Sequence, residues 1–424
     1  MTEEAKRKSP RRSRLAHLLR RIFSLAVILF PDLAAYPQSK PDKDYLVYVV
    51  SEAADKIALI RFGPGGARVD HDLETGDMAV DIDGPHGLIV SPDKQFYYIS
   101  IAHGRPFGSV WKYSVKDDRI VGRTTLGNFP ATMDISPDGG LLFVVNFNLH
   151  GDMVPSSVSV VATELMAEIK RIPTCTMPHG SRLNPQGTKQ YSACMMDDML
   201  VEIDTHTLKV ARHFLLTKGK ELGMNGPPLS GPAMSPNNSG AKETKPGNAH
   251  DMHNMSGMAG MKDTGGHGME SPKPGDVSCS PTWAQPSADG SSIFVACNKS
   301  SEIVEVNANS WKLVRRLPAR AGVYNLAITH DGTRLISTNK RDQSVSVIDL
   351  KSGKELARIP TKRKVLHGAV VSPDDRYAFI SVEGIGAEPG TVEIIDLGTL
   401  KTVATVDVGP EAAGIDFYKM EAAK

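Results

Sequence analysis

The stretch SPDGGLLFVVN, residues 136–146, decides the fold of this chain. Its first half has the composition of a type I turn, in which Pro137 fixes φ and Gly139 tolerates the exit from the turn. Its second half is a run of apolar and β-branched residues, which predicts a strand. Variants of the turn recur as SPDK at 91, NPQG at 184, SADG at 287, THDG at 329 and SPDD at 372. The chain therefore repeats a unit of a turn followed by a strand.

A second strand follows in each unit and sets the period of the repeat. Its residues alternate between apolar and polar, which is typical of a half-buried strand. Copies begin at residues 109, 157, 199, 302, 344 and 391, so successive copies are 48, 42, 103, 42 and 47 residues apart. The long interval contains an insertion. An all-strand repeat of about 40–50 residues predicts a β-propeller with four strands in each blade.

The two ends of the chain complete one another. The segment YLVYVVSEAADKIALIRF, residues 45–62, matches the middle of a unit and lacks its first strand, whereas AAGIDFYKM, residues 412–420, matches that first strand. We therefore predict an all-β, seven-bladed propeller over residues 36–424. Pairing of the N- and C-terminal strands would close the last blade and remove an exposed sheet edge.

Two of the repeated strands carry a further signature. FVVNFN at 143 and ISTNK at 336, each after a Pro-Asp-Gly or His-Asp-Gly turn, resemble the YVTN-repeat family of seven-bladed propellers. The resemblance extends over residues 43–420 and implies the fold. It implies no particular function, because one scaffold of this kind serves binding, hydrolysis and surface structure.

The amino terminus has the composition of an export signal. A basic run is followed by the apolar residues 22–30 and then by Leu33, Ala34 and Ala35. This order predicts a signal peptide over residues 1–35, cleaved near Ala35, and hence a periplasmic or secreted protein. The alternative is a membrane anchor, but a span takes about 20 apolar residues. We expect no transmembrane span in the mature chain.

Composition narrows the class of partner. The 424 residues are 40% hydrophobic, which indicates a globular rather than a disordered chain. The 49 basic and 48 acidic residues give a formal net charge of +1. Such a balance provides no strong field for nucleic acid, so we expect no nucleic-acid partner. We expect a monomer.

Five histidines are predicted to share one face of the propeller. In a blade, the loops before the first strand and after the second lie on the same, top face. His86, His179 and His367 each precede a first strand in a Pro-His-Gly or Leu-His-Gly phrase, and His103 and His150 lie in loops after second strands. Imidazole is a common ligand of copper, zinc and iron. The alternative is that these rings only bind backbone carbonyls of neighbouring loops. The equivalent positions in other blades are expected to be Ala131, Thr282, Asn325 and Glu411.

The insertion, residues 219–278, is rich in Pro, Gly, Ser, Asn and Lys, which predicts a flexible, disordered segment. It contains AHDMHNMSGMAGMKDTGGHGM, residues 249–269, which we call the Met/His tract. The candidate ligands in it are His250, Met252, His253, Met255, Met258, Met261, His267 and Met269. Thioether sulfur suits Cu(I), and imidazole suits both copper oxidation states. The tract resembles the Met- and His-rich stretches of exported copper-resistance proteins. An unstructured linker is the alternative.

The four cysteines form two similar pairs. Cys175 and Cys194 are 19 residues apart, and Cys279 and Cys297 are 18 apart, each pair bracketing a predicted hairpin. In an oxidising compartment this spacing favours two disulfides. Thiolate ligation of copper is the alternative, because Cys194 precedes Met195 and Met196.

The sequence is compatible with three functional hypotheses. No nucleophile elbow, His-Glu-x-x-His motif or phosphate-binding loop occurs. The first hypothesis is an exported propeller that binds copper for sequestration or delivery, with an envelope protein as a potential partner. The second is a metal-dependent oxidoreductase or hydrolase, with Asp197, Asp198 or Glu411 as acid–base groups. The third is a non-catalytic scaffold that binds a protein or polymer.

Overall fold

The computed structural model describes residues 40–77, 82–103, 107–228 and 277–423. The chain divides into Met1–Ser39 and Lys40–Lys424, and the description below concerns the second unit. The predicted signal peptide, residues 1–35, and the Met/His tract lie outside the described residues. Their structure is therefore not considered.

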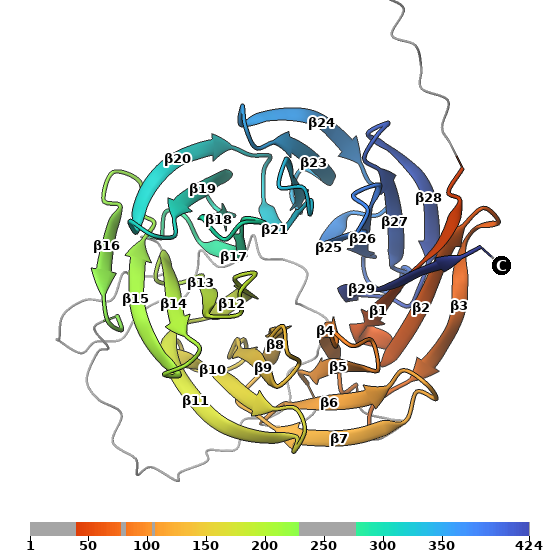
Figure 1. Ribbon diagram of the computed structural model, residues 1–424, viewed down its shortest axis with the longest axis horizontal. Helices are drawn as coiled ribbons and strands as arrows, with labels where there is room; N and C mark the ends of the chain where they lie inside the picture. Colours follow the sequence, from red (N-terminus) through yellow and green to blue (C-terminus); the bar gives the residue numbers. More distant parts are fainter. Residues whose placement is uncertain (1–39, 78–81, 104–106, 229–276, 424) are drawn as a thin grey trace, which may run out of the picture. The chain divides into compact units, whose positions relative to one another are not determined.

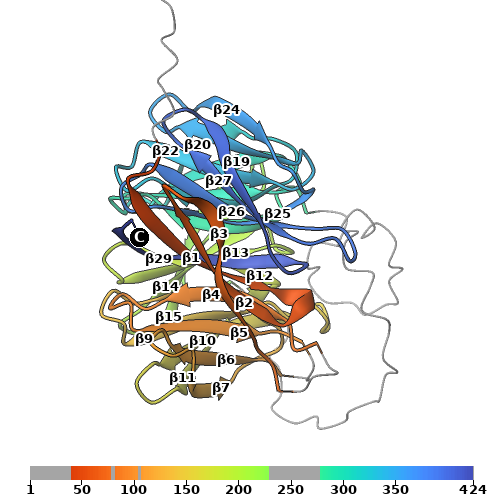
Figure 2. The same cartoon turned by 90° about the vertical axis from the view of Figure 1, so that its right-hand side faces the viewer.

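Seven antiparallel sheets stand around a central channel (Figure 1). In each sheet the first strand lies next to the channel, and the others follow outward in hydrogen-bonding order. Seen from the side, inner strands such as β4 (Pro85–Val90) and β12 (Pro178–Leu183) cross the thickness of the ring (Figure 2). Outer strands such as β24 (Lys354–Pro360) and β11 (Ala167–Thr176) instead curve along its rim (Figure 1). This arrangement confirms the predicted seven-bladed propeller.

We number blades 1 to 6 in chain order and call the seventh the closing blade. The strands of blades 1 to 3 are β4 (Pro85–Val90), β5 (Phe96–Ile101), β6 (Ser109–Ser114), β7 (Ile120–Thr125), β8 (Pro130–Ile135), β9 (Leu141–Asn146), β10 (Pro155–Ala162), β11 (Ala167–Thr176), β12 (Pro178–Leu183), β13 (Lys189–Cys194), β14 (Met199–Asp204), β15 (Lys209–Leu215) and β16 (Leu222–Asn225).

Blades 4 to 6 and the closing blade contain the remaining strands. They are β17 (Pro281–Pro286), β18 (Ser292–Cys297), β19 (Glu302–Asn307), β20 (Lys312–Pro318), β21 (Val323–Ile328), β22 (Arg334–Asn339), β23 (Ser344–Asp349), β24 (Lys354–Pro360), β25 (Val365–Val371), β26 (Tyr377–Glu383), β27 (Thr391–Asp396), β28 (Lys401–Asp407), β29 (Ala412–Ala422), β1 (Lys43–Ser51), β2 (Lys56–Gly63) and β3 (Gly66–Glu74). The 3₁₀ helix η1 (Glu52–Ala54) joins β1 to β2.

The closing blade joins the two ends of the chain. Its order is β29-β1-β2-β3, so the C-terminal strand lies innermost and pairs with the N-terminal one. Tyr45 pairs with Met420 and Val49 with Ile415 along this ladder. The predicted closure is confirmed, and its hydrogen bonds hold the ring together without an open edge between first and last blades.

Blade 3 differs from the prediction of four strands per blade. A fifth strand, β16, pairs with the outer strand β15, for example Leu215 with Leu222. The predicted insertion, residues 219–278, thus contributes a short strand to this blade. Residues 222–225 can join the sheet because the outer edge of β15 offers unpaired backbone groups.

The repeated turn has a consistent local cause. In blade 2, Ser136 Oγ donates to Asp138 Oδ1 at 2.5 Å, and Asp138 accepts the N–H of Gly140 at 3.0 Å. These hydrogen bonds lower the pKa of Asp138. Gly139 has a φ of 73°, which favours glycine at the turn exit. The turn signature in the sequence thus fixes where each hairpin between first and second strands begins.

The apolar core is divided among the blade interfaces. Phe143 and Val158 of blade 2, for instance, pack with Leu183 and Val201 of blade 3. Both predicted disulfides are present, Cys175–Cys194 and Cys279–Cys297. The alternative of thiolate ligation is wrong for these cysteines. Each bridge of this loop length contributes about 3 kcal/mol by the chain-entropy estimate.

Candidate metal site at the channel mouth

Three histidines reach the mouth of the channel from three blades. His86, His179 and His367 stand at the start of the inner strands β4, β12 and β25 and are 7%, 2% and 6% exposed. The structure thus places them on the common face that the sequence predicts.

A steric constraint explains why glycine follows each of these histidines. A Cβ atom on Gly87 would lie 2.1 Å from the carbonyl oxygen of Ala131, and one on Gly180 would lie 2.3 Å from that of Thr282. Only glycine lets neighbouring inner strands approach so closely. The His-Gly phrase therefore marks positions where backbones crowd around the channel.

Strand register corrects two of the expected equivalents. In β4 the second residue, His86, forms the mouth; the second residues of β21 and β29 are Tyr324 and Ala413. Asn325 lies one level deeper, and Glu411 precedes its strand. A proline precedes the mouth residue in β4, β8, β12 and β17, whereas β21 and β29 lack it, so no local signal marks the register of these two strands.

Glu52 connects two of the histidines. It follows β1 and is 8% exposed. His86 Nδ1 lies 2.7 Å from Glu52 Oε2, and His103 Nε2 lies 2.6 Å from Oε1. Burial by itself would raise the pKa of Glu52, but the two imidazoles hold it well below its ordinary value. Burial opposes the charged form of His103, yet Glu52 raises the pKa of that imidazole.

Glu383 holds His367 in the same way. His367 Nδ1 lies 2.6 Å from Glu383 Oε1, and Lys340 Nζ lies 3.3 Å from the same oxygen. Burial and the Lys340 charge lower the pKa of His367 to about 4. Burial would raise the pKa of Glu383, but Lys340 and His367 lower it to about 2. At neutral pH the carboxylate of Glu383 therefore faces the neutral imidazole of His367 and the ammonium group of Lys340.

His179 has different neighbours. Its Nδ1 lies 2.9 Å from the carbonyl oxygen of Thr282, and its Nε2 accepts from Tyr324 Oη at 2.9 Å. Burial lowers the pKa of His179 to about 3. Because the Thr282 carbonyl accepts a hydrogen bond from Nδ1–H and the Tyr324 hydroxyl donates one to Nε2, both ring nitrogens are occupied by protein groups.

An aromatic layer surrounds these polar pairs. The rings of His86 and His367 lie 5.0 Å apart between centroids. Edge contacts of 4.8–5.8 Å continue from ring to ring around the mouth through Phe129, Phe147, His103, His179 and Tyr324. These rings therefore form a continuous circle of contacts at the mouth.

His150 lies at the outer side of this layer and is exposed. Its ring is 5.6 Å from that of His103 and 5.5 Å from that of Phe129. Burial of its ring and the neighbouring His103 lower the pKa of His150. His103 and His150 are thus adjacent, but Glu52 already takes the Nε2 of His103.

His86 and His367 form the arrangement that best fits a metal ligand pair. A carboxylate only accepts hydrogen bonds, so each Nδ1 is the donor, and in a neutral imidazole Nε2 then carries the lone pair. Carboxylate–histidine pairs of this kind orient metal-binding imidazoles. His86 Nε2 is buried and has no hydrogen-bonding partner among the described protein atoms. Within residues 40–77, 82–103, 107–228 and 277–423, no group of three or more His, Cys, Asp and Glu is arranged to hold a metal.

Three functional neighbours were missed at the sequence level. Glu52, Lys340 and Glu383 occupy equivalent positions at the end of the strand that pairs with the inner strand. Glu52 and Lys340 directly follow β1 and β22, and Glu383 is the last residue of β26. In other blades this position holds Phe147 and Met195. Alignment of the repeats at that position would have revealed the charged groups, whereas a search for histidines did not.

The proposed acid–base carboxylates support loops instead. Asp198 accepts the N–H groups of Ser278, Cys279 and Ser280 at 2.6–3.0 Å. Asp197 accepts the N–H of Thr176 at 2.6 Å, and burial raises its pKa. These contacts explain the positions of both side chains without a reaction.

Glu411 lies next to η1. Its carbonyl oxygen accepts the N–H of Glu52 at 2.9 Å. Its charge contributes to the raised pKa of His103. Glu411 is therefore near the mouth, although not at the position expected from the sequence.

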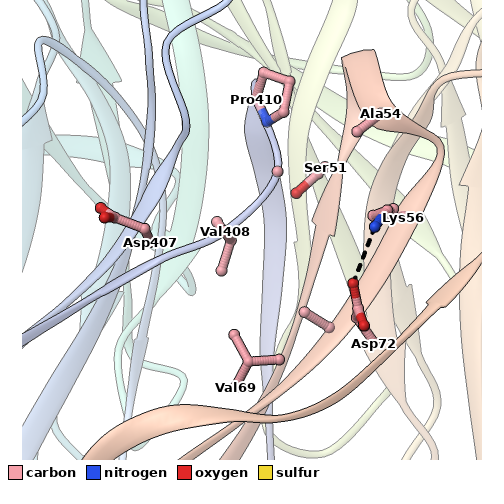
Figure 3. A pocket seen from close by; sticks show the side chains of 10 residues that line it. Ser51, Ala54, Lys56, Val69, Asp72, Asp407, Val408 and Pro410 are labelled. Carbon is pink, nitrogen blue, oxygen red and sulfur yellow. Dashed lines mark hydrogen bonds and ion pairs between the residues drawn. The ribbon is translucent and has the colours of Figure 1, made fainter.

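The hollows in the described part of the chain include the following two. One is a cavity of about 30 Å³ in the channel beneath His86 and His367. The other is a groove of about 300 Å³ between the closing blade and blade 6, lined by Val69, Val408 and the Lys56–Asp72 ion pair (Figure 3). Only the channel cavity adjoins the candidate metal ligands.

Residues 330–421 match the Cytochrome D1 heme domain family, which covers less than a quarter of the chain. No curated protein matches the sequence. None of the described helices has the length and apolar character required to cross a membrane.

Solved structures share the fold at low identity. The periplasmic gluconolactonase PpgL of Pseudomonas aeruginosa has a TM-score of 0.62 and 14% identity, covering 90% of this chain and 100% of that one. A functionally unknown protein from Desulfotomaculum acetoxidans gives 0.59 and 12%, covering 88% and 98%. Hydrazine synthase of Kuenenia stuttgartiensis gives 0.53 and 19%, covering 77% and 82%. These likenesses concern the propeller fold alone.

The family match raises the question of whether the mouth fits a haem d1 group. Pockets for organic ligands of that kind measure about 300–1,000 Å³. The channel cavity is about 30 Å³, and the aromatic layer occupies the space above it. The described mouth does not fit a tetrapyrrole, and we derive no step through one.

Proposed function

We propose that this protein binds copper at the channel mouth through Nε2 of His86 and Nε2 of His367, and that it serves copper sequestration or delivery in an exported compartment. The two disulfides agree with an oxidising compartment. In this proposal the Met/His tract captures the ion and the channel mouth retains it.

One observation carries the proposal. Two buried imidazoles from different blades line the same cavity, and each gives its Nδ1 to a buried carboxylate. The ring centroids are 5.0 Å apart, so one ion can lie between the two Nε2 atoms after small rotations of the rings. A structural role would not require an unpartnered buried Nε2 on His86 beside a second imidazole that lines the same cavity.

The chemistry of the ligands favours copper. Cu(I) accepts two or three ligands, which suits a site with two imidazoles, whereas structural zinc is almost always four-coordinate. Imidazole serves copper in both oxidation states, and the thioethers of the tract select Cu(I). The lowered pKa of His367 keeps that imidazole neutral, and therefore able to bind a metal, well below pH 6.5.

The experiment is the metal content per chain of exported protein after exposure to limiting copper and zinc. Four forms are compared: the full chain, a deletion of residues 248–270, the double variant His86→Ala/His367→Ala, and His206→Ala. His206 is exposed on a distant turn and serves as the control. We expect the deletion to slow copper uptake and the double variant to lose the retained ion, while His206→Ala keeps it.

The other outcomes separate the alternatives. Copper that disappears with residues 248–270 but not with the two histidines would make the tract the sole site. An absence of metal from the full chain would favour the binding scaffold. A further variant tests whether the tract is the sole site, because it removes the thioethers without shortening the chain. It replaces Met252, Met255, Met258 and Met261 by Leu.

A further inference from the structure

A small cavity lies in the channel at the level beneath the imidazoles. Four of the seven inner strands have glycine there, and the full set is Gly87, Thr132, Gly180, Trp283, Asn325, Gly368 and Gly414. The hydroxyl of Thr132 donates to the carbonyl oxygen of His179. Trp283 and Asn325 are therefore the two polar side chains of this level with no role in joining the strands.

Three buried polar atoms around this space have no partner among the described protein atoms. They are His86 Nε2, Trp283 Nε1 and Asn325 Oδ1. All three residues line the channel cavity and are at most 7% exposed. Buried polar atoms in native proteins are almost always paired, with protein or with ordered water.

Among the three tryptophans, the unpaired indole N–H is particular to Trp283. Trp111 Nε1 donates to Ser109 Oγ at 2.9 Å, and Trp311 Nε1 donates to the carbonyl oxygen of His213 at 2.9 Å. Only the indole that faces the channel cavity has an unpaired N–H within the described chain.

The three atoms define the chemistry of their ligand. The indole N–H can only donate, and the Asn325 carbonyl can only accept. A volume of about 30 Å³ admits one or two molecules of the size of water. Water satisfies both groups at once, since it accepts from Trp283 and donates to Asn325.

The charges around the cavity do not select an anion. The Arg182 guanidinium lies over the Trp283 ring at 4.5 Å. Burial raises the pKa of Asp134 and of Asp416, and Arg182 counteracts the rise at both carboxyls. The guanidinium is thus shared between two acids, which leaves a neutral ligand as the best fit.

We infer that the channel cavity holds an exchangeable water molecule bound by Trp283 and Asn325, and that this is the position where copper on His86 and His367 takes a small third ligand. The second part rests on the proposed function, and the first does not. A closed metal site has no such position, whereas an open one exchanges ligands. The site would therefore accept neutral molecules of one or two heavy atoms.

Carbon monoxide tests the third position, because it binds Cu(I) and its stretching frequency reports hydrogen bonding. We expect one infrared band from the copper-loaded full chain. The band should move to higher frequency in Trp283→Phe, which removes the donor, and should stay in place in Trp111→Phe. Stoichiometric copper without a carbon monoxide band, or with a band that is the same in both variants, would overturn the third-ligand position while leaving copper binding intact.

Indole NMR of metal-free protein tests the water independently of copper. The protein has three tryptophans, and Trp283→Phe assigns the resonance of interest. We expect the Trp283 indole proton, unlike those of Trp111 and Trp311, to show a cross-peak with water. If that cross-peak is absent, or if it persists unchanged in Asn325→Leu, the cavity water is refuted whether or not the protein binds copper.

Discussion

The histidines on two sides of the channel mouth share nearly the same sequence phrase, Pro-His-Gly or Leu-His-Gly, but have different hydrogen-bonding partners. On one side, His86 and His367 direct Nδ1 to Glu52 and Glu383. On the other side, His179 directs Nδ1 to a backbone carbonyl and Nε2 to Tyr324. The phrase sets the place of the ring, but partners from its own blade or from a neighbouring one decide whether a nitrogen remains available to a ligand.

The difference between these histidines arises at one position of the blade, at the end of the strand that pairs with the inner strand. That position is Glu52 in the closing blade and Glu383 in blade 6, but it is Met195 in blade 3. A carboxylate fixes the tautomer and increases the basicity of the imidazole it binds. A thioether does neither, so the proposed copper site includes His86 and His367 but not His179.

The largest expected effect separates the two sides directly. We predict that His367→Ala weakens Cu(I) binding by more than about 100-fold, because loss of a ligand should exceed the 10–100-fold effect of losing its outer partner. His179→Ala should change it by less than about threefold on the same reasoning. Competition with a coloured Cu(I) chelator measures both affinities, with His206→Ala as the control. Equal losses at both positions would remove the distinction between the two sides.

Removal of the carboxylates should have the next largest effect. Glu52→Gln and Glu383→Gln keep the shape of the side chain but not its charge, and we predict that each weakens Cu(I) binding by about 10–100-fold. The exposed Glu164 gives a matched control, Glu164→Gln. Unchanged affinity in both mouth variants, measured by the same competition, would show that these carboxylates do not support a metal ligand.

The pH dependence of stability sharpens the comparison further. The pKa values of His367 and His179 are lowered to about 4 and about 3, so the unfolded chain binds more protons than the folded one below about pH 6.5. Stability contributed by these neutral rings is therefore present above pH 6.5 and is lost as the pH falls toward 4. Urea unfolding of the metal-free protein between pH 4 and 7 measures the slope. His367→Gln should flatten it, and a slope unchanged by that variant would contradict the lowered pKa.

The smallest expected effect concerns the structural side alone. Tyr324→Phe removes the hydroxyl that donates to His179 Nε2 and should lower the free energy of unfolding by about 1 kcal/mol. Copper affinity should not change, because neither metal ligand loses a contact. Chemical denaturation and the chelator competition report the two quantities separately. A loss of copper without a loss of stability would assign Tyr324 to the metal site.

Much of the architecture follows from local sequence. The turn around Pro137 recurs with the spacing of a four-stranded blade. The unit at residues 45–62 is incomplete and therefore requires a partner strand from elsewhere in the chain. Cys175 and Cys194 bracket one hairpin, which brings their sulfurs together once the hairpin forms. β16 was not predicted, because its pairing depends on a free edge rather than on an alternating pattern.

The candidate site was predicted only in part, for a related reason. Sequence alone determined that the ring of blades forms and that five histidines share one face, because turns and strand alternation act over a few residues. Only the tertiary structure decided that Glu52, from the closing blade, reaches His86 of blade 1. Hydrogen bonds between blades join residues that no local pattern relates, and these bonds determine which imidazole nitrogen can bind an ion.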